Sequence, residues 1–145
     1  MNKNLEHTHH QTFEGIKQTN SAGEEFWLAR QLGKILDYSE YRNFLPVIEK
    51  AKKSCANSGQ PVSDHFVEIH EMIEIGKGGQ REMPSYALSR YACYLIVQNG
   101  DPAKPVIANG QTYFAIQTRR QELADNEAFQ RLKEDEKRLY LRNEM

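Results

Sequence analysis

The sequence predicts a helix-rich α+β fold in which two small antiparallel β-hairpins pack on about five helices. Two pairs of short runs with β-type alternation flank glycine-containing turns, which is typical of hairpins. Elsewhere apolar residues recur at three- and four-residue intervals, the period of an amphipathic helix. The chain has 145 residues, of which 39% are hydrophobic, so one domain with a buried core can form.

The first hairpin is predicted from the strands Phe13–Gln18 and Glu25–Leu28, joined by a turn over residues 20–23. A helix follows over Ala29–Leu36, with Gly33 inside it. Glycine within a helix costs about 1 kcal/mol relative to alanine, so we expect another backbone to pack closely there. A helix-turn-helix has a glycine at its close helix contact, and this run therefore raises the question of DNA binding.

The second helix is expected to begin after Ser39, a residue type that caps helix N-termini well. Pro46 lies within it and should either kink the helix or mark a new first turn. Its apolar stripe consists of Tyr41, Phe44, Leu45, Ile48 and Cys55.

The second hairpin is predicted from the strands Met72–Ile75 and Met83–Leu88, with residues 76–79 as its loop. Before it, Ser63 and Asp64 are expected to cap a short helical turn over His65–Ile69.

Three further helices are expected in the second half of the chain. Ser89 should cap the first, and Asp101 with Pro102 should begin the second, which extends to about Glu122. The last helix should run from about Asn126 to the end of the chain, supported by charge pairs four residues apart.

Three segments are expected along the chain. Residues 1–11 are polar and expected to be disordered, residues 12–122 form the α+β domain, and residues 123–145 form a charged helix. The last helix has no C-cap signal, so we expect it to continue into a further C-terminal region.

The net charge is −1, which is not the overall signature of a nucleic-acid-binding protein, but its distribution is uneven. Residues 29–53 carry a balance of +3 and residues 76–120 carry +4, whereas residues 54–75 carry −4. A basic face is therefore possible if the fold brings the two basic blocks together.

The sequence also indicates the cellular location of the protein and the redox state of its cysteines. The chain has no apolar run of membrane-spanning length and no signal peptide at its N-terminus, so we expect a cytoplasmic protein without a membrane partner. Cys55 and Cys93 form no CxxC motif and are expected to be reduced core residues.

No catalytic, metal or cofactor site is predicted. His65 and His70 are five residues apart, which does not suit one helical face, and the remaining histidines lie in the polar N-terminal tail. There is no GxSxG motif and no activated cysteine, so we do not expect an enzyme.

Long, gap-free blocks give the chain a specific family resemblance. The stretches ARQLGKILDYSEYRNFLPVIEKAK, LSRYACYLIVQNGDPAKPVIA and GQTYFAIQTRRQELAD resemble the family of DNA-damage-inducible protein D from enterobacteria, and the resemblance runs from about Phe13 to Met145. Members of that family extend past the end of this chain. The resemblance implies a bacterial protein with a role in the DNA-damage (SOS) response and no catalytic residues.

The order of elements is also similar to the BRO-type N-terminal domain of viral BRO proteins and phage antirepressors. That domain is associated with DNA binding, which the resemblance implies for residues 12–122 here. The commoner form of its first helix has glycine immediately before the tyrosine, where this chain has Asp37.

The candidate site residues follow from the basic blocks and the two-helix pattern. The start of a recognition helix supplies most base contacts, and lysine and arginine neutralise phosphates. The DNA-binding candidates are Lys34, Tyr41, Arg42, Asn43, Lys50, Lys52, Lys53, Lys77, Arg81, Arg119 and Arg120.

Each candidate also has a purely structural interpretation. Tyr41 belongs to an apolar stripe and is buried under that interpretation, the lysines form a solvated helix end, and residues 76–81 form an ordinary turn. The alternative function is a module that binds a repair or recombination protein, or its own copy, through the last helix. The candidate interface residues are Phe129, Leu132, Leu139 and Tyr140.

Overall fold

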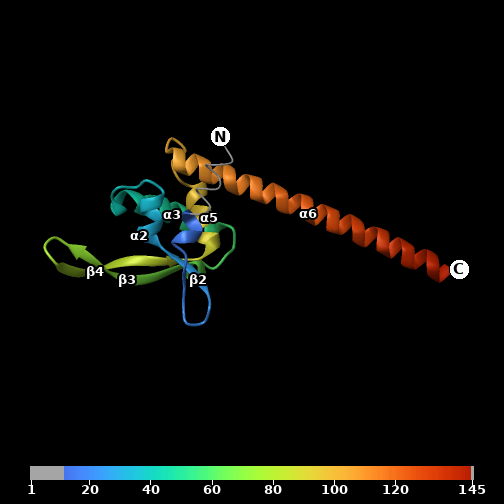
Figure 1. Cartoon of the computed structure of the whole chain (residues 1–145), viewed down its shortest axis with the longest axis horizontal. Coiled ribbons are helices and arrows are strands. Elements are labelled where there is room, and N and C mark those ends of the chain that lie inside the picture. The colour runs from blue at the N-terminus through green and yellow to red at the C-terminus, as the bar shows by residue number, and fades with distance from the viewer. Residues whose placement is uncertain (1–11, 145) are drawn as a thin grey trace. The chain divides into compact units, whose positions relative to one another are not determined.

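The computed structural model describes the backbone of residues 12–144 and the side chains of residues 12–136 (Figure 1). The predicted disordered tail, residues 1–11, lies outside the described residues. Contacts divide the chain into two units, residues 1–111 and 112–145, and each is described by itself. The elements are β1 (Gln18–Thr19), β2 (Glu25–Leu28), α2 (Ala29–Ile35), α3 (Tyr41–Asn57), α4 (Val62–His65), β3 (Phe66–Ile75), β4 (Gly79–Leu88), α5 (Arg90–Gln98) and α6 (Pro105–Glu144).

The α+β class is confirmed, but the two hairpins form one sheet rather than two separate units. Over the described residues the sheet has four antiparallel strands in the order β1-β2-β4-β3. The joint is short, since β2 pairs with β4 only through Trp27 opposite Leu88 and Leu28 opposite Ala87. Both Trp27 and Leu88 are fully buried, so core packing accounts for the joint.

The second hairpin is longer than predicted. Strands β3 and β4 pair continuously from Phe66 opposite Leu88 to Ile75 opposite Gly79. The expected helical turn over His65–Ile69 is therefore wrong, because α4 ends at His65 and the next residues join the sheet. Phe66 is buried, and its register beside Leu88 places it in the core.

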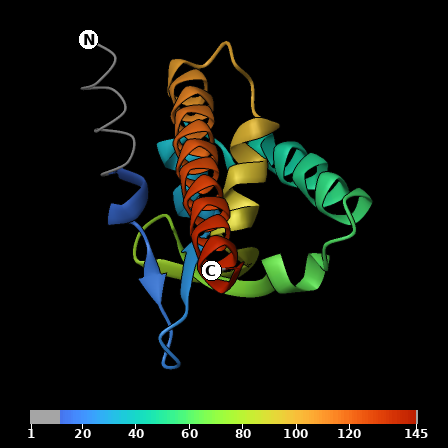
Figure 2. The same ribbon diagram turned by 90° about the vertical axis from the view of Figure 1, so that its right-hand side faces the viewer.

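Helices α2, α3 and α5 lie on one side of the long β3–β4 hairpin, as both views show (Figures 1 and 2). The core of this unit lies between these helices and the strands. Its largest fully buried side chains are Trp27, Phe44, Leu32, Leu36, Ile48, Leu88, Ile96, Ile107, Val97, Cys55 and Cys93. The two cysteines are free as well as buried, as expected.

The N-terminal strand predicted over Phe13–Gln18 is wrong over most of its length. Residues 12–15 are helical, and only Gln18 and Thr19 form a strand. The reason is tertiary, because the Phe13 ring stacks on Trp27 at 4.5 Å and its carbonyl accepts a hydrogen bond from Trp27 Nε1 at 2.8 Å.

Arg90 of α5 binds the same N-terminal segment through side-chain hydrogen bonds. It donates to Glu14 Oε1 at 2.7 Å and to Glu25 Oε2 at 2.8 Å, and its guanidinium lies 5.0 Å from the Trp27 ring centre. The hydrogen bond from Arg90 lowers the pKa of Glu14. A residue of α5 thus joins the N-terminal segment to β2.

The predicted caps of α5 and α3 had different outcomes. Ser89 does cap α5, accepting a hydrogen bond from the Ala92 amide at 3.0 Å. Ser39 does not cap α3, whose N-cap is Glu40, without a side-chain hydrogen bond. Helix α3 is continuous over Tyr41–Asn57, so Pro46 does not mark a new first turn, and the kink stays a prediction.

The predicted start of α6 at Asp101 and Pro102 is also wrong. Asp101 Oδ1 accepts from the Ala103 amide at 2.9 Å, so these residues form a turn, and Pro105 occupies the first helical position instead. The helix then continues through residues 123–125, where a break was expected. None of the described helices has both the length and the apolar character needed to cross a membrane.

Gly33 has the close neighbour that the sequence predicts, but this neighbour is a side chain rather than a backbone. A Cβ placed on Gly33 would lie 2.8 Å from Cδ2 of Phe44, which is fully buried and cannot withdraw without disturbing the core. Overpacking costs about 1–3 kcal/mol, whereas alanine regains about 1 kcal/mol of helix propensity.

We therefore expect Gly33→Ala to lower the free energy of unfolding by up to about 2 kcal/mol in urea denaturation. The matched control is Gly15→Ala, because Gly15 is also helical and no atom of its described surroundings lies within 4 Å of the position that a methyl group would occupy. Equal stability of the two variants would contradict a tight contact between α2 and α3.

Candidate nucleic-acid interface

A tight connection places the start of α3. Asp37 adopts a left-handed conformation with φ of 70°, and the Tyr38 amide donates to the Gly33 carbonyl at 2.9 Å. Aspartate is among the few residues besides glycine that adopt this conformation readily. Asp37 therefore forms the same turn as the glycine that is commoner at this position of BRO-type domains. The Asp37 carbonyl also accepts from Lys104 Nζ at 2.9 Å.

Arg30 of α2 connects this helix with α3 and with the sheet. Its guanidinium carbon lies 4.0 Å from the centre of the Tyr41 ring, within cation–π range. Its Nη2 donates to the Pro84 carbonyl at 2.8 Å, and its Nε lies 4.0 Å from the Glu71 carboxylate. The first residue of α3 is thereby held above the middle of the β3–β4 hairpin.

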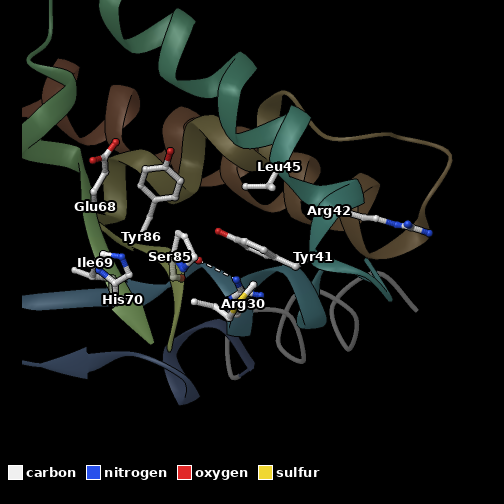
Figure 3. Close-up of a pocket in the computed structure, with 11 residues that line it drawn as sticks. Arg30, Tyr41, Arg42, Leu45, Glu68, Ile69, His70, Ser85 and Tyr86 are labelled. Carbon is white, nitrogen blue, oxygen red and sulfur yellow. Dashed lines mark hydrogen bonds between the residues drawn. The ribbon is translucent and has the colours of Figure 1, made fainter. Parts of the chain in front are cut away.

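A groove of about 570 Å³ runs between α3 and this hairpin (Figure 3). Its wall is mixed, with aromatic and aliphatic side chains beside charged ones. In Figure 3 Arg42 lies at one end and Glu68 at the other, with Tyr41, Ser85 and Arg30 between them. The lining residues are Arg30, Tyr41, Arg42, Leu45, Glu68, Ile69, His70, Met83, Pro84, Ser85 and Tyr86.

Several buried polar atoms in and beside this groove have no hydrogen-bond partner among the described residues. They are the hydroxyls of Tyr41 and Ser85, Nε of Arg30 and Oε2 of Glu71. Burial raises the pKa of Tyr41, and the nearby Ser85 hydroxyl and Arg30 charge oppose this rise. The effect of Ser85 on the Tyr41 pKa indicates that the two hydroxyls are neighbours. Their distance and angle do not meet the criteria for a hydrogen bond.

Residues 15–115 match the BRO family, N-terminal domain. The chain belongs to this family. Within the BRO domain lie the two-helix connection, the Arg30 contacts and every residue that lines the groove. No solved structure matches the chain.

The chain is also similar to DNA damage-inducible protein D of Escherichia coli (strain K12). The two sequences are 66% identical over 137 residues, which is 94% of this chain and 50% of that protein. The chain therefore spans about half the length of this relative.

The candidate residues of α3 differ in their exposure to solvent. Arg42, Asn43, Lys50 and Lys53 are exposed, and Arg42 forms an ion pair with Glu40. Tyr41 is half-buried and lines the groove, and its contact with DNA stays a prediction.

Lys52 also points toward the sheet. Its Nζ donates to the Tyr86 hydroxyl at 3.2 Å and lies 3.6 Å from the Glu49 carboxylate. Partial burial disfavours its charge, but these two contacts outweigh burial and raise its pKa. Lys52 is therefore a structural residue in the free protein, unlike Lys50 and Lys53.

The hairpin candidates lie toward the tip of β3 and β4. Lys77 occupies the loop between Gly76 and Gly78, both of which have positive φ, and it is exposed. Arg81 is exposed on β4 opposite Ile73. Positive φ favours glycine at both positions, which explains the glycine-rich composition of this loop.

Lys34 is exposed on α2, on the other side of Tyr41 from the groove. It lines a second hollow of about 500 Å³, together with residues of β3. Arg30 and Tyr41 line both hollows and form the wall between them.

The other candidates belong to the second unit and lie beyond the BRO match. Arg119 and Arg120 are exposed on α6, and Arg119 pairs with Glu122 at 3.2 Å. Phe129 and Leu132 are 55% and 63% exposed. Leu139 and Tyr140 lie outside the described side chains.

Outside the groove, the side chains of His65 and Ser89 contact each other. His65 Nδ1 lies 2.7 Å from the Ser89 hydroxyl, which also caps α5. This pair therefore joins α4 to α5. Over the described residues, no group of three or more His, Cys, Asp or Glu side chains could hold a metal ion.

Sequence reasoning missed Arg30, Ser85, Tyr86 and Glu71. Arg30 is 54 residues from the Pro84 carbonyl that it contacts, and Lys52 is 34 residues from Tyr86. No local pattern encodes such contacts. The basic balance of residues 29–53 included Arg30 but gave no reason to single it out.

Proposed function

We propose that this BRO domain is a non-enzymatic, cytoplasmic module of the DNA-damage response that binds DNA through a basic face. The similarity to a DNA damage-inducible protein supports the biological setting. The association of BRO-type domains with DNA binding supports the activity.

The observation that carries this proposal is the exposed face of α3. Arg42, Lys50 and Lys53 lie free of the core on one helix, and the groove begins at the Arg42 end. Exposed cations neutralise phosphates without sequence preference and release counterions as they do so. Asn43, beside Arg42, adds an amide that can hydrogen-bond to a base edge.

Lys77 and Arg81, which are exposed toward the tip of the β3–β4 hairpin, are proposed as a second set of phosphate contacts. A flexible basic hairpin can contact the backbone or minor groove of a duplex beside the main binding helix. Arg119 and Arg120 would act as further phosphate contacts supplied by α6.

Fluorescence anisotropy with labelled single- and double-stranded oligonucleotides, at low and at physiological salt, tests this proposal. We expect binding that weakens as salt rises, with a slope set by the number of phosphates contacted. Absence of binding to both kinds of oligonucleotide at low salt would contradict it.

A protein-interaction module is the second candidate, and the exposure of Phe129 and Leu132 on α6 favours it. Large apolar side chains three residues apart on a helix form a docking stripe for a repair or recombination protein or a second copy. Retention on heparin at low salt separates the two, because a protein adaptor with a net charge of −1 should pass through.

A further inference from the structure

We propose that the groove between α3 and the β3–β4 hairpin holds one unstacked nucleobase of single-stranded DNA. This inference rests on the proposed function and adds the kind of strand and the place where a base is held.

The first argument is the set of polar groups without partners. Ser85 is 3% exposed, yet its hydroxyl has no hydrogen-bond partner among the described residues, and the same is true of the Tyr41 hydroxyl. Each such buried group costs about 1–3 kcal/mol, so both favour an occupant with donors and acceptors. Each hydroxyl both donates and accepts, which suits the edge of a base.

The second argument is the shape and lining of the groove. Its volume of about 570 Å³ is in the range of small-molecule sites. Two aromatic rings, Tyr41 and Tyr86, and the aliphatic side chains of Leu45 and Met83 line it. Proteins that bind single strands stack bases on such rings and read their edges with neighbouring polar groups.

The third argument is the distribution of charge along the groove. Arg42 is 80% exposed at one end, where a phosphate can reach it, and Glu68 lies at the other end (Figure 3). A phosphate at the Arg42 end would place its base toward Tyr41 and Ser85. The Glu68 carboxylate would repel phosphate but can accept a hydrogen bond from an exocyclic amine.

This geometry selects single strands over duplexes. A base inside a duplex is stacked and paired, and it must be extruded at a cost of a few kcal/mol before it can enter a pocket. A single strand avoids most of that cost. The inference is thus that a single strand binds more tightly than a duplex of equal length at the same salt.

The test is the double variant Tyr41→Phe with Ser85→Ala, which removes both hydroxyls and keeps the aromatic ring. Because neither hydroxyl has a hydrogen-bond partner among the described residues, we expect the melting temperature to stay equal or rise. We expect single-strand affinity to fall roughly tenfold, since each lost hydrogen bond is worth about 0.5–1.5 kcal/mol. The salt slope should not change, because no phosphate contact is lost.

The matched control is Ser58→Ala with Tyr91→Phe. These two hydroxyls lie 3.3 Å apart and partner each other away from the groove. We expect this control to lower the melting temperature slightly and to leave DNA affinity unchanged.

An abasic strand of the same length separates base binding from phosphate binding. The unmodified protein should bind it about as weakly as the groove variant binds the normal strand. Equal affinity of the groove variant and the unmodified protein for the normal strand would overturn the inference while leaving the proposed function intact. Absence of all DNA binding by the unmodified protein would overturn both.

Discussion

Replacing Trp27 with alanine is expected to lower the free energy of unfolding by about 3–5 kcal/mol, the usual cost of removing a large buried aromatic side chain. Trp27 is fully buried and stacks on Phe13 with the two rings only 7° from parallel. Its Nε1 is also the donor to the Phe13 carbonyl, which would lose this bond. The variant therefore loses core volume and the attachment of the N-terminal segment together.

Urea denaturation followed by circular dichroism is the appropriate measurement, because Trp27 is the only tryptophan in the sequence and its fluorescence disappears with it. Met72→Ala is the control, since Met72 is 62% exposed on β3 and should change stability by less than about 0.5 kcal/mol. A loss below about 1 kcal/mol for Trp27→Ala would contradict its central place in the core.

Replacing Lys50 and Lys53 together with alanine is expected to weaken DNA binding by about ten- to a hundredfold at low salt. Hydrogen bonds to charged groups are worth about 1.5–3 kcal/mol before screening, and screening lowers that value at exposed sites. The slope of affinity against salt should fall by about 2, because two phosphate contacts are lost. Lys52 is left in place, since its contacts with Tyr86 and Glu49 are internal.

The control for this pair is Lys17→Ala with Lys133→Ala, which changes the net charge by the same amount. Lys17 precedes β1, and Lys133 lies on α6, so neither belongs to the exposed face of α3. Anisotropy titrations at two salt concentrations compare the pairs. Equal losses would show that overall charge, rather than the face of α3, determines affinity.

Strong local signals explain why much of the fold could be predicted. Strand β2 and helix α2 lie almost where the sequence predicts them. Turns flank this pair of elements, and between them the spacing of apolar residues changes from that of a strand to that of a helix. Ser89 caps α5 as predicted, because a serine preceding an apolar helical stripe has few alternatives.

The errors arose where local signals competed. Two prolines, Pro102 and Pro105, could each begin α6. Because Asp101 forms a turn with Ala103, the helix begins at Pro105. Residues 12–15 became helical because Phe13 and Glu14 have partners on Trp27 and Arg90, far along the chain.

The candidate site was predictable only as a set of exposed charges. Arg42, Lys50 and Lys53 are conspicuous in the sequence and lie on the surface of α3. The groove beside them was not predictable, because its walls come from α2, α3, β3 and β4.

By itself, the sequence determined the α+β class, the two-helix connection with Gly33 at its contact, and the family. These properties depend on local periodicity, turn residues and long matching blocks, which need no three-dimensional information. The tertiary structure alone decided that both hairpins share one sheet and that Lys52 turns inward. It also decided that the Tyr41 and Ser85 hydroxyls lie in one groove without partners among the described residues. These features depend on contacts between residues tens of positions apart, and packing of the whole core selects such contacts.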